Sequence, residues 1–299
     1  MMRLALIGLG EVGGLFARDL AARGAPPLAA YDIRQGEADS APARQARALG
    51  LPLAPSAAEA ARGAELVICA VTAGRAEEAA RAAAPGLSPG ALYMDVNSVS
   101  PATKAAIAAI VEATGARFLE AAVMTSVPPH GMRAPMLLGG PHAAAALPAL
   151  AALGFRAELF SEEIGRASAV KMCRSVMIKG LEALVTECLL AARHYGVEQP
   201  VLASLADTLP HPDWAAQARY MMGRALQHGR RRAEEMREVA RTVAEAGLSP
   251  LQSAATAERQ DWAADLRGRL PPEALREEDL GRLLDALRAA LDLRAQPGA

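Results

Sequence analysis

The sequence is poor in aromatic side chains, and its charges balance almost completely. Only 3% of the 299 residues are aromatic, which argues against the stacking platforms that bind single-stranded nucleic acid. There are 32 lysines and arginines against 33 aspartates and glutamates, so no strong field attracts nucleic acid or an anionic membrane surface. No apolar run reaches the roughly 18 residues of a membrane span. We therefore expect neither a nucleic-acid nor a membrane partner.

Cysteine is also scarce, and the three that occur predict no disulfide. Cys69 lies in an apolar run, while Cys173 and Cys188 fall on one predicted helix, about 22 Å apart along its axis. We expect all three to be reduced core residues, with no metal site. No charged leader precedes a longer apolar segment at the N-terminus, so we expect a cytoplasmic protein. A hydrophobic content of 52% over this length suits two globular domains.

An apolar run at residues 4–7 ends in glycines with the spacing G-x-G-x-x-G and continues as a helical pattern. In a strand, turn and helix, Gly8 permits the sharp turn, Gly10 leaves room for a pyrophosphate, and Gly13 allows close helix–strand packing. A second apolar run ends on Asp32, where a carboxylate can accept hydrogen bonds from ribose hydroxyls. This spacing predicts a dinucleotide site made by Gly8, Leu9, Gly10, Glu11, Val12, Gly13 and Asp32.

The carboxylate of Asp32 favours NAD over NADP, because it would repel a 2′-phosphate. Arg34 keeps NADP open as an alternative, since it can stack on adenine or accommodate that phosphate. Thr72 ends the apolar run 65–71 and is a candidate cofactor contact, although threonines at this position often cap the next helix.

Strand-like and helical patterns alternate through the first half of the chain. Apolar runs at 65–71, 91–95, 117–123, 135–138 and 155–160 are separated by helical or loop segments. This alternation predicts a Rossmann-type doubly wound α/β sheet over residues 1–161, with ligands at the carboxyl ends of its strands. From residue 162 to the end only helical periodicity is found, so we expect an all-α C-terminal domain.

The first helix of that domain is expected at 165–194, with residues 161–163 as its cap. Its apolar stripe and its polar side lie nearly opposite each other. The apolar positions are Val170, Cys173, Met177, Leu181, Leu184 and Cys188, and the polar ones are Lys171, Ser175, Lys179 and Glu182. Further on, residues 230–232 are three arginines, which we interpret as a solvated face with i,i+4 ion pairs. A role as a substrate anchor stays open for them.

Three separated segments together resemble the β-hydroxyacid dehydrogenase family, which includes 3-hydroxyisobutyrate and 6-phosphogluconate dehydrogenases. The first is the glycine motif. The second, residues 118–126, is similar to the family's substrate loop D-A-P-V-S-G-G, although Met124, Thr125 and Ser126 replace its serine and two glycines. The loop after residue 95 also resembles the nicotinamide loop of 6-phosphogluconate dehydrogenase, which makes Asn97 a candidate cofactor contact.

The third segment, residues 165–175, is similar to the family's helix G-x-x-x-K-x-x-N-N. Lys171 falls on the catalytic lysine, while Arg174 and Ser175 replace the asparagine pair. The resemblance implies hydride transfer between a nicotinamide cofactor and a small β-hydroxyacid-like substrate. Lys171 would be the general acid and base, and Ser175 would hydrogen-bond the substrate hydroxyl. Backbone N–H groups of residues 124–126 would hold a substrate carboxylate, and Arg174 is a further candidate contact.

Two alternatives remain. The altered substrate loop and asparagine positions are compatible with an imine or other C=N reductase, and the fold also suits a noncatalytic dinucleotide-binding protein. Decarboxylation of 6-phosphogluconate is not expected, because Arg174 and Ile178 replace the histidine and glutamate of that enzyme's helix. The family resemblance and the alanine-rich helical domain predict a homodimer or a higher homo-oligomer.

Overall fold

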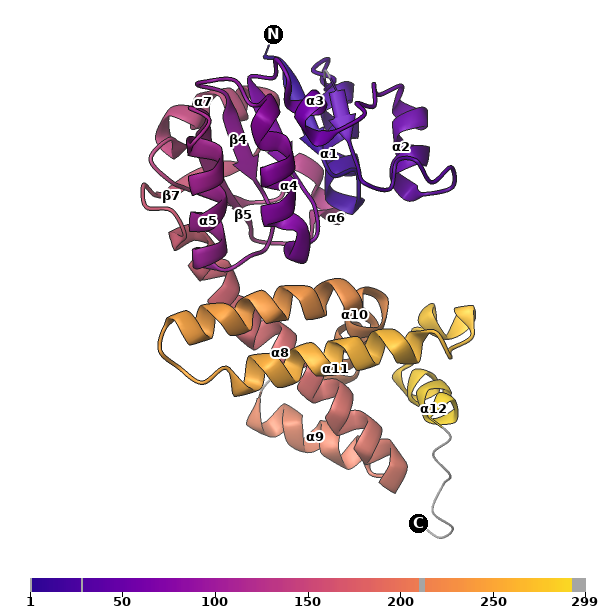
Figure 1. The fold of residues 1–299 in the computed structure, drawn as a ribbon. Coiled ribbons are helices and arrows are strands. Elements are labelled where there is room, and N and C mark those ends of the chain that lie inside the picture. The colour runs from indigo at the N-terminus through magenta and orange to yellow at the C-terminus, as the bar shows by residue number, and fades with distance from the viewer. Residues whose placement is uncertain (1, 28, 210–212, 292–299) are drawn as a thin grey trace. The chain divides into compact units, whose positions relative to one another are not determined.

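The computed structural model describes residues 2–27, 29–209 and 213–291 of the chain (Figure 1). The chain divides into two compact units, Met1–Cys173 and Arg174–Ala299. The division falls within the long helix α8 (Arg166–Tyr195). The boundary expected at 161/162 precedes this helix, so the first two turns of α8 belong to the N-terminal unit.

A seven-stranded sheet between helices forms the N-terminal unit (Figure 1). Its strand order is β2-β1-β3-β4-β5-β6-β7, and all neighbours are parallel except the antiparallel pair β5–β6. This architecture confirms the Rossmann-type sheet, although the antiparallel pair is not part of the prediction. The strands are β1 (Leu4–Ile7), β2 (Ala29–Tyr31), β3 (Leu66–Cys69), β4 (Leu92–Asp95), β5 (Arg117–Val123), β6 (Met136–Gly139) and β7 (Ala157–Ser161).

Helices cover both faces of this sheet. Side chains alternate along each strand, so one strand contributes to an apolar cluster on either face. Leu4 and Leu6 of β1 belong to one apolar cluster, and Ala5 and Ile7 to another. The covering helices are α1 (Glu11–Ala22), α2 (Ala41–Leu49), α3 (Ala57–Ala61), α4 (Ala76–Ala83), α5 (Pro101–Glu112), α6 (Val127–His130) and α7 (Ala143–Leu153).

The C-terminal unit is all-helical over its described residues, as expected. After α8 come α9 (Glu198–Thr208), α10 (Trp214–Glu245), α11 (Leu251–Arg267) and α12 (Leu280–Ala290). Helices α10 and α11 approach closely at Gly229, where an added Cβ would lie 2.3 Å from the backbone oxygen of Gln260. None of the helices described is long and apolar enough to cross a membrane.

Helix α8 buries the side that its sequence pattern suggests is exposed. Met177 and Leu184 of the apolar stripe are 63% and 59% exposed, whereas Ser175, Lys179 and Glu182 are buried. The reason lies in charged side chains on α10, which pair with Lys179 and Glu182. Among the cysteines only Cys69 is buried, so the expectation that Cys173 and Cys188 are core residues is wrong.

Candidate cofactor and active site

The glycine motif forms the turn between β1 and α1, and its glycines meet different constraints. Gly8 has a φ of +91°, and an added Cβ would lie 2.3 Å from the backbone oxygen of Ala70. At Gly13 an added Cβ would lie 1.9 Å from the backbone oxygen of Gly8. At Gly10, by contrast, an added Cβ would meet no atom within 4 Å. Gly8 and Gly13 are therefore required by packing, while Gly10 leaves open space at the start of α1, which suits an incoming pyrophosphate.

Asp32 follows β2 and lies beside this turn. Its Oδ2 accepts a hydrogen bond from the backbone N–H of Leu9 at 2.8 Å, and its Oδ1 accepts one from the N–H of Arg34 at 2.9 Å. Arg34 itself forms an exposed ion pair with Glu37 at 2.9 Å, and the hydrogen bond between them raises the pKa of Arg34. The carboxylate of Asp32 is thus held in place by two backbone groups, next to the glycine turn.

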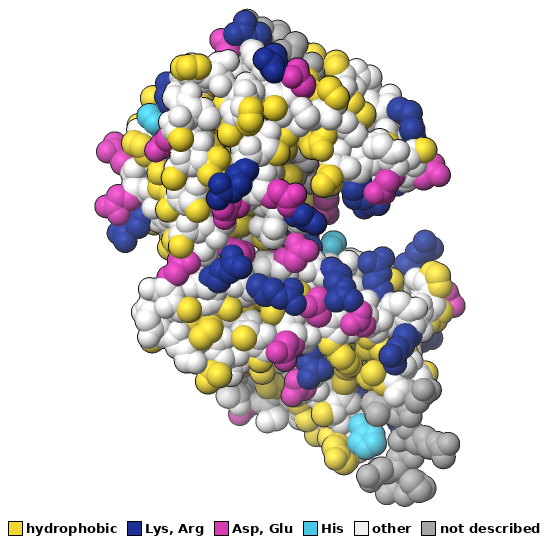
Figure 2. Space-filling view, in the orientation of Figure 1, with side chains coloured by type: hydrophobic (Ala, Val, Ile, Leu, Met, Phe, Trp, Pro, Cys, Tyr) yellow, Lys and Arg dark blue, Asp and Glu magenta, His cyan; other side chains and the backbone are white. Residues whose placement is uncertain are grey.

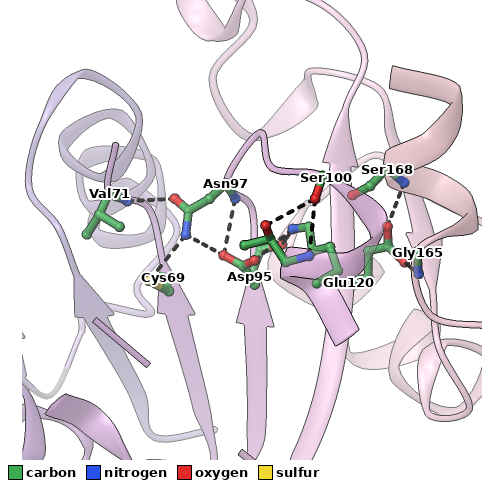
Figure 3. A network of polar contacts seen from close by, with 10 residues as sticks. Cys69, Val71, Asp95, Asn97, Ser100, Glu120, Gly165 and Ser168 are labelled. Atoms are coloured by element: carbon green, nitrogen blue, oxygen red, sulfur yellow. Dashed lines mark hydrogen bonds and ion pairs between the residues drawn. The ribbon is translucent and has the colours of Figure 1, made fainter. Parts of the chain in front are cut away.

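Asn97 connects the loops that follow β3 and β4 (Figure 3). Its Oδ1 accepts a hydrogen bond from the N–H of Val71 at 2.8 Å, and its Nδ2 donates to Asp95 and, at 3.4 Å, to the sulfur of Cys69. Only 4% of Asn97 is exposed. Thr72 is exposed, and its side chain does not cap the 3₁₀ turn Ala73–Arg75 that follows it. Asn97 therefore ties two strand ends together, at the edge where ligands of such sheets bind.

A fully buried ion pair lies beneath Asn97. The Nζ of Lys104 on α5 is 2.8 Å from Oδ2 of Asp95 and donates to the backbone oxygen of Asp95 at 2.9 Å. Neither side chain is exposed. Sequence reasoning missed this pair, although Lys104 lies three residues before Ile107 and seven before Val111, on the apolar side of α5, which was a signal for it.

Glu120 in the middle of β5 anchors the start of α8 (Figure 3). Its Oε2 accepts a hydrogen bond from the N–H of Gly165 at 2.6 Å, and its Oε1 accepts one from the N–H of Ser168 at 2.5 Å. The Oγ of Ser161 accepts a hydrogen bond from the N–H of Glu163, ahead of the helix, so Ser161 does not cap α8. Lys171 lies about one turn beyond Ser168 and is half-buried. Glu120 therefore positions the helix that carries the candidate catalytic lysine.

The substrate loop follows the same strand. The N–H of Met124 donates to the backbone oxygen of Pro135 at 2.9 Å, as a continuation of the β5–β6 pairing. This corrects the expectation for Met124, whose amide is already used. Thr125 is exposed and Ser126 is half-buried. The predicted carboxylate contact is thereby narrowed to the amides of Thr125 and Ser126.

The remaining candidates lie on α8 within the C-terminal unit. Arg174 is exposed, and Ser175 is 6% exposed. The Oγ of Ser175 accepts a hydrogen bond from the Nζ of Lys179 at 3.2 Å. Lys179 in turn forms an ion pair with Glu235 of α10 at 2.6 Å. The buried pair of Lys179 with Glu235 was not anticipated, because its acidic partner lies on a distant segment of the chain.

The three arginines of α10 have acidic partners within their own unit. Arg230 pairs with Asp261 and Asp265 of α11, and Arg231 pairs with Glu235 one turn along, as i,i+4 spacing predicts. Arg232 is instead 4% exposed and pairs with Glu182 at 2.5 Å. Basic and acidic side chains intermingle on the surface in Figure 2, in keeping with such pairs. The solvated-face interpretation is therefore wrong for Arg232.

Comparisons with known proteins cover both units. The family model for the NAD binding domain of 6-phosphogluconate dehydrogenase matches residues 3–155, and a domain of unknown function matches residues 192–263. A crystal structure of a conserved hypothetical protein from Sinorhizobium meliloti 1021 is 36% identical, with 97% of each chain covered and a TM-score of 0.72.

Two further solved structures are similar to this chain. A conserved protein of unknown function, reported to be structurally similar to 3-hydroxyacid dehydrogenases, is 31% identical over 89% of this chain and 99% of its own, with a TM-score of 0.66. An imine reductase from Aspergillus terreus in complex with NADPH4 and dibenz[c,e]azepine is 18% identical over 92% of this chain and 98% of its own, with a TM-score of 0.56. The imine reductase shows a shared fold alone.

Proposed function

Because the chain belongs to the β-hydroxyacid dehydrogenase family, we propose that it transfers hydride between a nicotinamide dinucleotide and a small β-hydroxyacid-like substrate. The observation that carries this proposal is the combination of an open glycine turn at the start of α1 with Lys171 on the helix that Glu120 anchors. Both features lie in the N-terminal unit.

The residues of the glycine turn fit a dinucleotide. The space at Gly10 and the N–H groups in the first turn of α1 suit a pyrophosphate, and Asp32 is held where it can accept from ribose hydroxyls. We propose NAD rather than NADP, since the Asp32 carboxylate would face a 2′-phosphate and the charge of Arg34 is balanced by Glu37. When bound, the nicotinamide accepts or supplies the hydride.

Lys171 is proposed to move the proton. Oxidation of an alcohol removes a hydride from carbon and leaves a hydroxyl proton, which a side chain must take up. In oxidation the neutral amine of Lys171 would accept this proton, and in reduction the ammonium would return it to the developing alkoxide. The amides of Thr125 and Ser126 are proposed to hold the substrate carboxylate.

The test is to replace Lys171 by alanine and to screen β-hydroxyacids and the corresponding oxoacids with both cofactors. General acid–base catalysis contributes about 10²–10⁴-fold, so kcat should fall by at least that order while NADH affinity stays nearly unchanged. Lys171→Arg should not restore activity, because a guanidinium does not give up its proton at working pH.

The matched control is Arg166→Ala, which removes an exposed cation from the same helix. Its ion pair with Glu163 spans 3.6 Å on the surface, so its loss should leave kcat unchanged. A Lys171→Ala variant that keeps more than about a tenth of wild-type kcat would contradict the catalytic role.

Imine reduction is the second candidate. It is favoured by Met124, Thr125 and Ser126 in place of the family's serine and glycines, and by Ser175 in place of an asparagine. The same screen should therefore include cyclic imines with NADPH and NADH. Turnover of imines without turnover of any hydroxyacid or oxoacid would replace the dehydrogenase proposal with this one.

We also propose that the protein is a homodimer or a higher homo-oligomer. Met177 and Leu184 lie seven residues apart on α8, which places them on one face of the helix, and both are mostly exposed. Large exposed apolar side chains in a row are typical of an interaction surface. A second copy of the chain, in keeping with the symmetry of most soluble oligomers, would cover them.

A further inference from the structure

The buried ion pair of Lys104 with Asp95 has no part in the proposed chemistry, yet it lies at the end of β4. Both side chains are fully buried, and the Nζ of Lys104 lies 2.8 Å from Oδ2 of Asp95. A buried ion pair often stabilises a protein no more than a well-packed apolar pair would, because desolvation of both charges offsets their attraction. Stability alone therefore does not account for the pair.

The other oxygen of Asp95 connects the pair to Asn97 (Figure 3). Oδ1 of Asp95 accepts hydrogen bonds from Nδ2 of Asn97 and, at 3.3 Å, from its backbone N–H. Nδ2 also donates to the sulfur of Cys69 at 3.4 Å. An amide nitrogen has two hydrogens, and both are used inside the protein. The side chain of Asn97 therefore has no N–H left for a bound ligand.

The amide oxygen of Asn97 holds the loop that follows β3. The N–H of Val96 donates to the backbone oxygen of Cys69 at 3.1 Å, which continues the pairing of β4 with β3. Beyond it, the N–H of Val71 donates to Oδ1 of Asn97 at 2.8 Å, so a side chain supplies one more rung. Val71 also borders the glycine turn, because an added Cβ at Gly8 would lie 2.9 Å from its Cγ1. A row of contacts thus leads from the buried pair to the wall of the proposed dinucleotide site.

We propose that Lys104 is a positioning residue for the dinucleotide, acting through Asp95 and Asn97 on the loop after β3. The inference rests on the proposed function, because it takes the carboxyl edge of the sheet to bind NAD. The lysine fixes the carboxylate, the carboxylate orients the amide, and the amide holds Val71. Asn97 then acts on the cofactor through the position of this loop and not as a hydrogen-bond donor.

The order of the strands indicates which half of the dinucleotide depends on this loop. Asp32 follows β2, the glycine turn follows β1, and β3 and β4 are the next parallel strands along the sheet. Neighbouring strands lie about 4.8 Å apart, so the end of β4 is roughly 14 Å from that of β2. With Asp32 at the adenosine ribose and the glycine turn at the pyrophosphate, the ends of β3 and β4 would face the nicotinamide riboside. Binding of AMP, which lacks that half, should not depend on Lys104.

The experiment is a double-mutant cycle on Lys104→Met and Asn97→Ala in the full chain, read as the affinities for NADH and for AMP in calorimetric titrations. Each single substitution should weaken NADH binding about tenfold, which is the order of one hydrogen bond, and change AMP binding by less than about twofold. The double variant should bind NADH no more weakly than the weaker single variant, because both changes release the same loop.

The matched control is Ile107→Ala. Ile107 is fully buried on α5, about one turn beyond Lys104, so its truncation lowers the melting temperature and leaves the bonds of Asn97 in place. Its affinity for NADH should equal that of the wild type. If Lys104→Met does not fold, Lys104→Met combined with Asp95→Asn removes both charges and takes its place in the cycle. This variant should also weaken NADH binding, because no lysine fixes the new amide, and an unchanged NADH affinity in it refutes the proposal.

Cys69 supplies a readout that does not depend on activity. It is fully buried, and its sulfur accepts a hydrogen bond from Asn97. Release of the loop should expose it locally, so at pH 8 a thiol reagent should modify Cys69 in folded Lys104→Met at least about tenfold faster than in Ile107→Ala of the same stability. Bound NADH should slow this reaction. Equal rates in the two variants contradict a local effect of Lys104.

The outcomes separate the two proposals. A wild type that binds NADH, with equal losses of NADH and AMP affinity in Lys104→Met or with additive effects in the cycle, refutes the role of Lys104 and leaves the proposed function intact. A loss of NADH affinity in Ile107→Ala equal to that in Lys104→Met also refutes it, because instability alone would then explain both. A wild type that binds neither NADH nor NADPH overturns the function and this role together.

Discussion

Replacing Glu120 by glutamine should destabilise the N-terminal unit by loosening the start of α8. The carboxylate accepts hydrogen bonds of 2.6 and 2.5 Å from Gly165 and Ser168, and the side chain is fully buried. Glutamine keeps one acceptor oxygen and turns an NH₂ group toward the other N–H. The variant therefore loses one charge-assisted bond, leaves a buried donor without a partner, and removes a negative charge from a helix N-terminus.

Together these effects should lower the free energy of unfolding by about 2–4 kcal/mol, since hydrogen bonds to charged groups contribute about 1.5–3 kcal/mol. For a unit of this size the melting temperature should fall by roughly 4–16 °C in differential scanning calorimetry. The control is Glu162→Gln, an exposed position just before the helix, which should stay within about 0.5 kcal/mol of wild type.

A second variant tests the same contact from the other side. An added Cβ at Gly139 would lie 2.4 Å from Oε2 of Glu120, so Gly139→Ala should displace the carboxylate and destabilise the unit as well. Combined with Glu120→Gln, it should cost less than the sum of the two single changes, because they disturb one interaction. If the free energy of unfolding of Glu120→Gln lies within about 0.5 kcal/mol of the wild-type value, this account of how α8 is held is refuted.

Three further outcomes are expected. NADH should bind more tightly than NADPH in fluorescence titrations. Glu37→Gln, which releases Arg34 from its ion pair, should narrow the difference in affinity between the two cofactors. Tighter binding of NADPH to the wild type would contradict the choice of cofactor. Light scattering should show at least a dimer at micromolar concentration and a folded monomer for Leu184→Asp, whereas a monomeric wild type would exclude the proposed interface. Burial raises the pKa of Cys69 to about 12 from an ordinary value near 9. Between these pH values the unfolded chain loses a proton that the folded protein keeps, so the free energy of unfolding should fall as pH rises. At pH 8 a thiol reagent should modify only the two exposed cysteines until the protein is unfolded, and rapid reaction of Cys69 in the native state would disprove its burial.

Features that depend on local spacing can be predicted from the amino-acid sequence. Every apolar run assigned to the sheet is a strand, and the glycine motif forms the expected turn, because alternation along a strand and the left-handed conformation of Gly8 are properties of short segments. The helical nature of the C-terminal domain follows from the same kind of periodicity. The start of α2 at Ala41 is local in the same way, since the Oγ of Ser40 accepts a hydrogen bond from the N–H of Ala43.

Contacts between distant segments determine which charged groups are buried and which parts of the chain these groups hold in place. Glu120 caps α8 from 45 residues away, and Lys179 and Glu182 turn inward because Glu235 and Arg232 meet them from α10. The hydrophobic pattern of α8 alone favours the opposite orientation. A charged side chain enters a protein interior at low cost only when a partner from another segment neutralises it, and no local sequence pattern shows where that partner will lie.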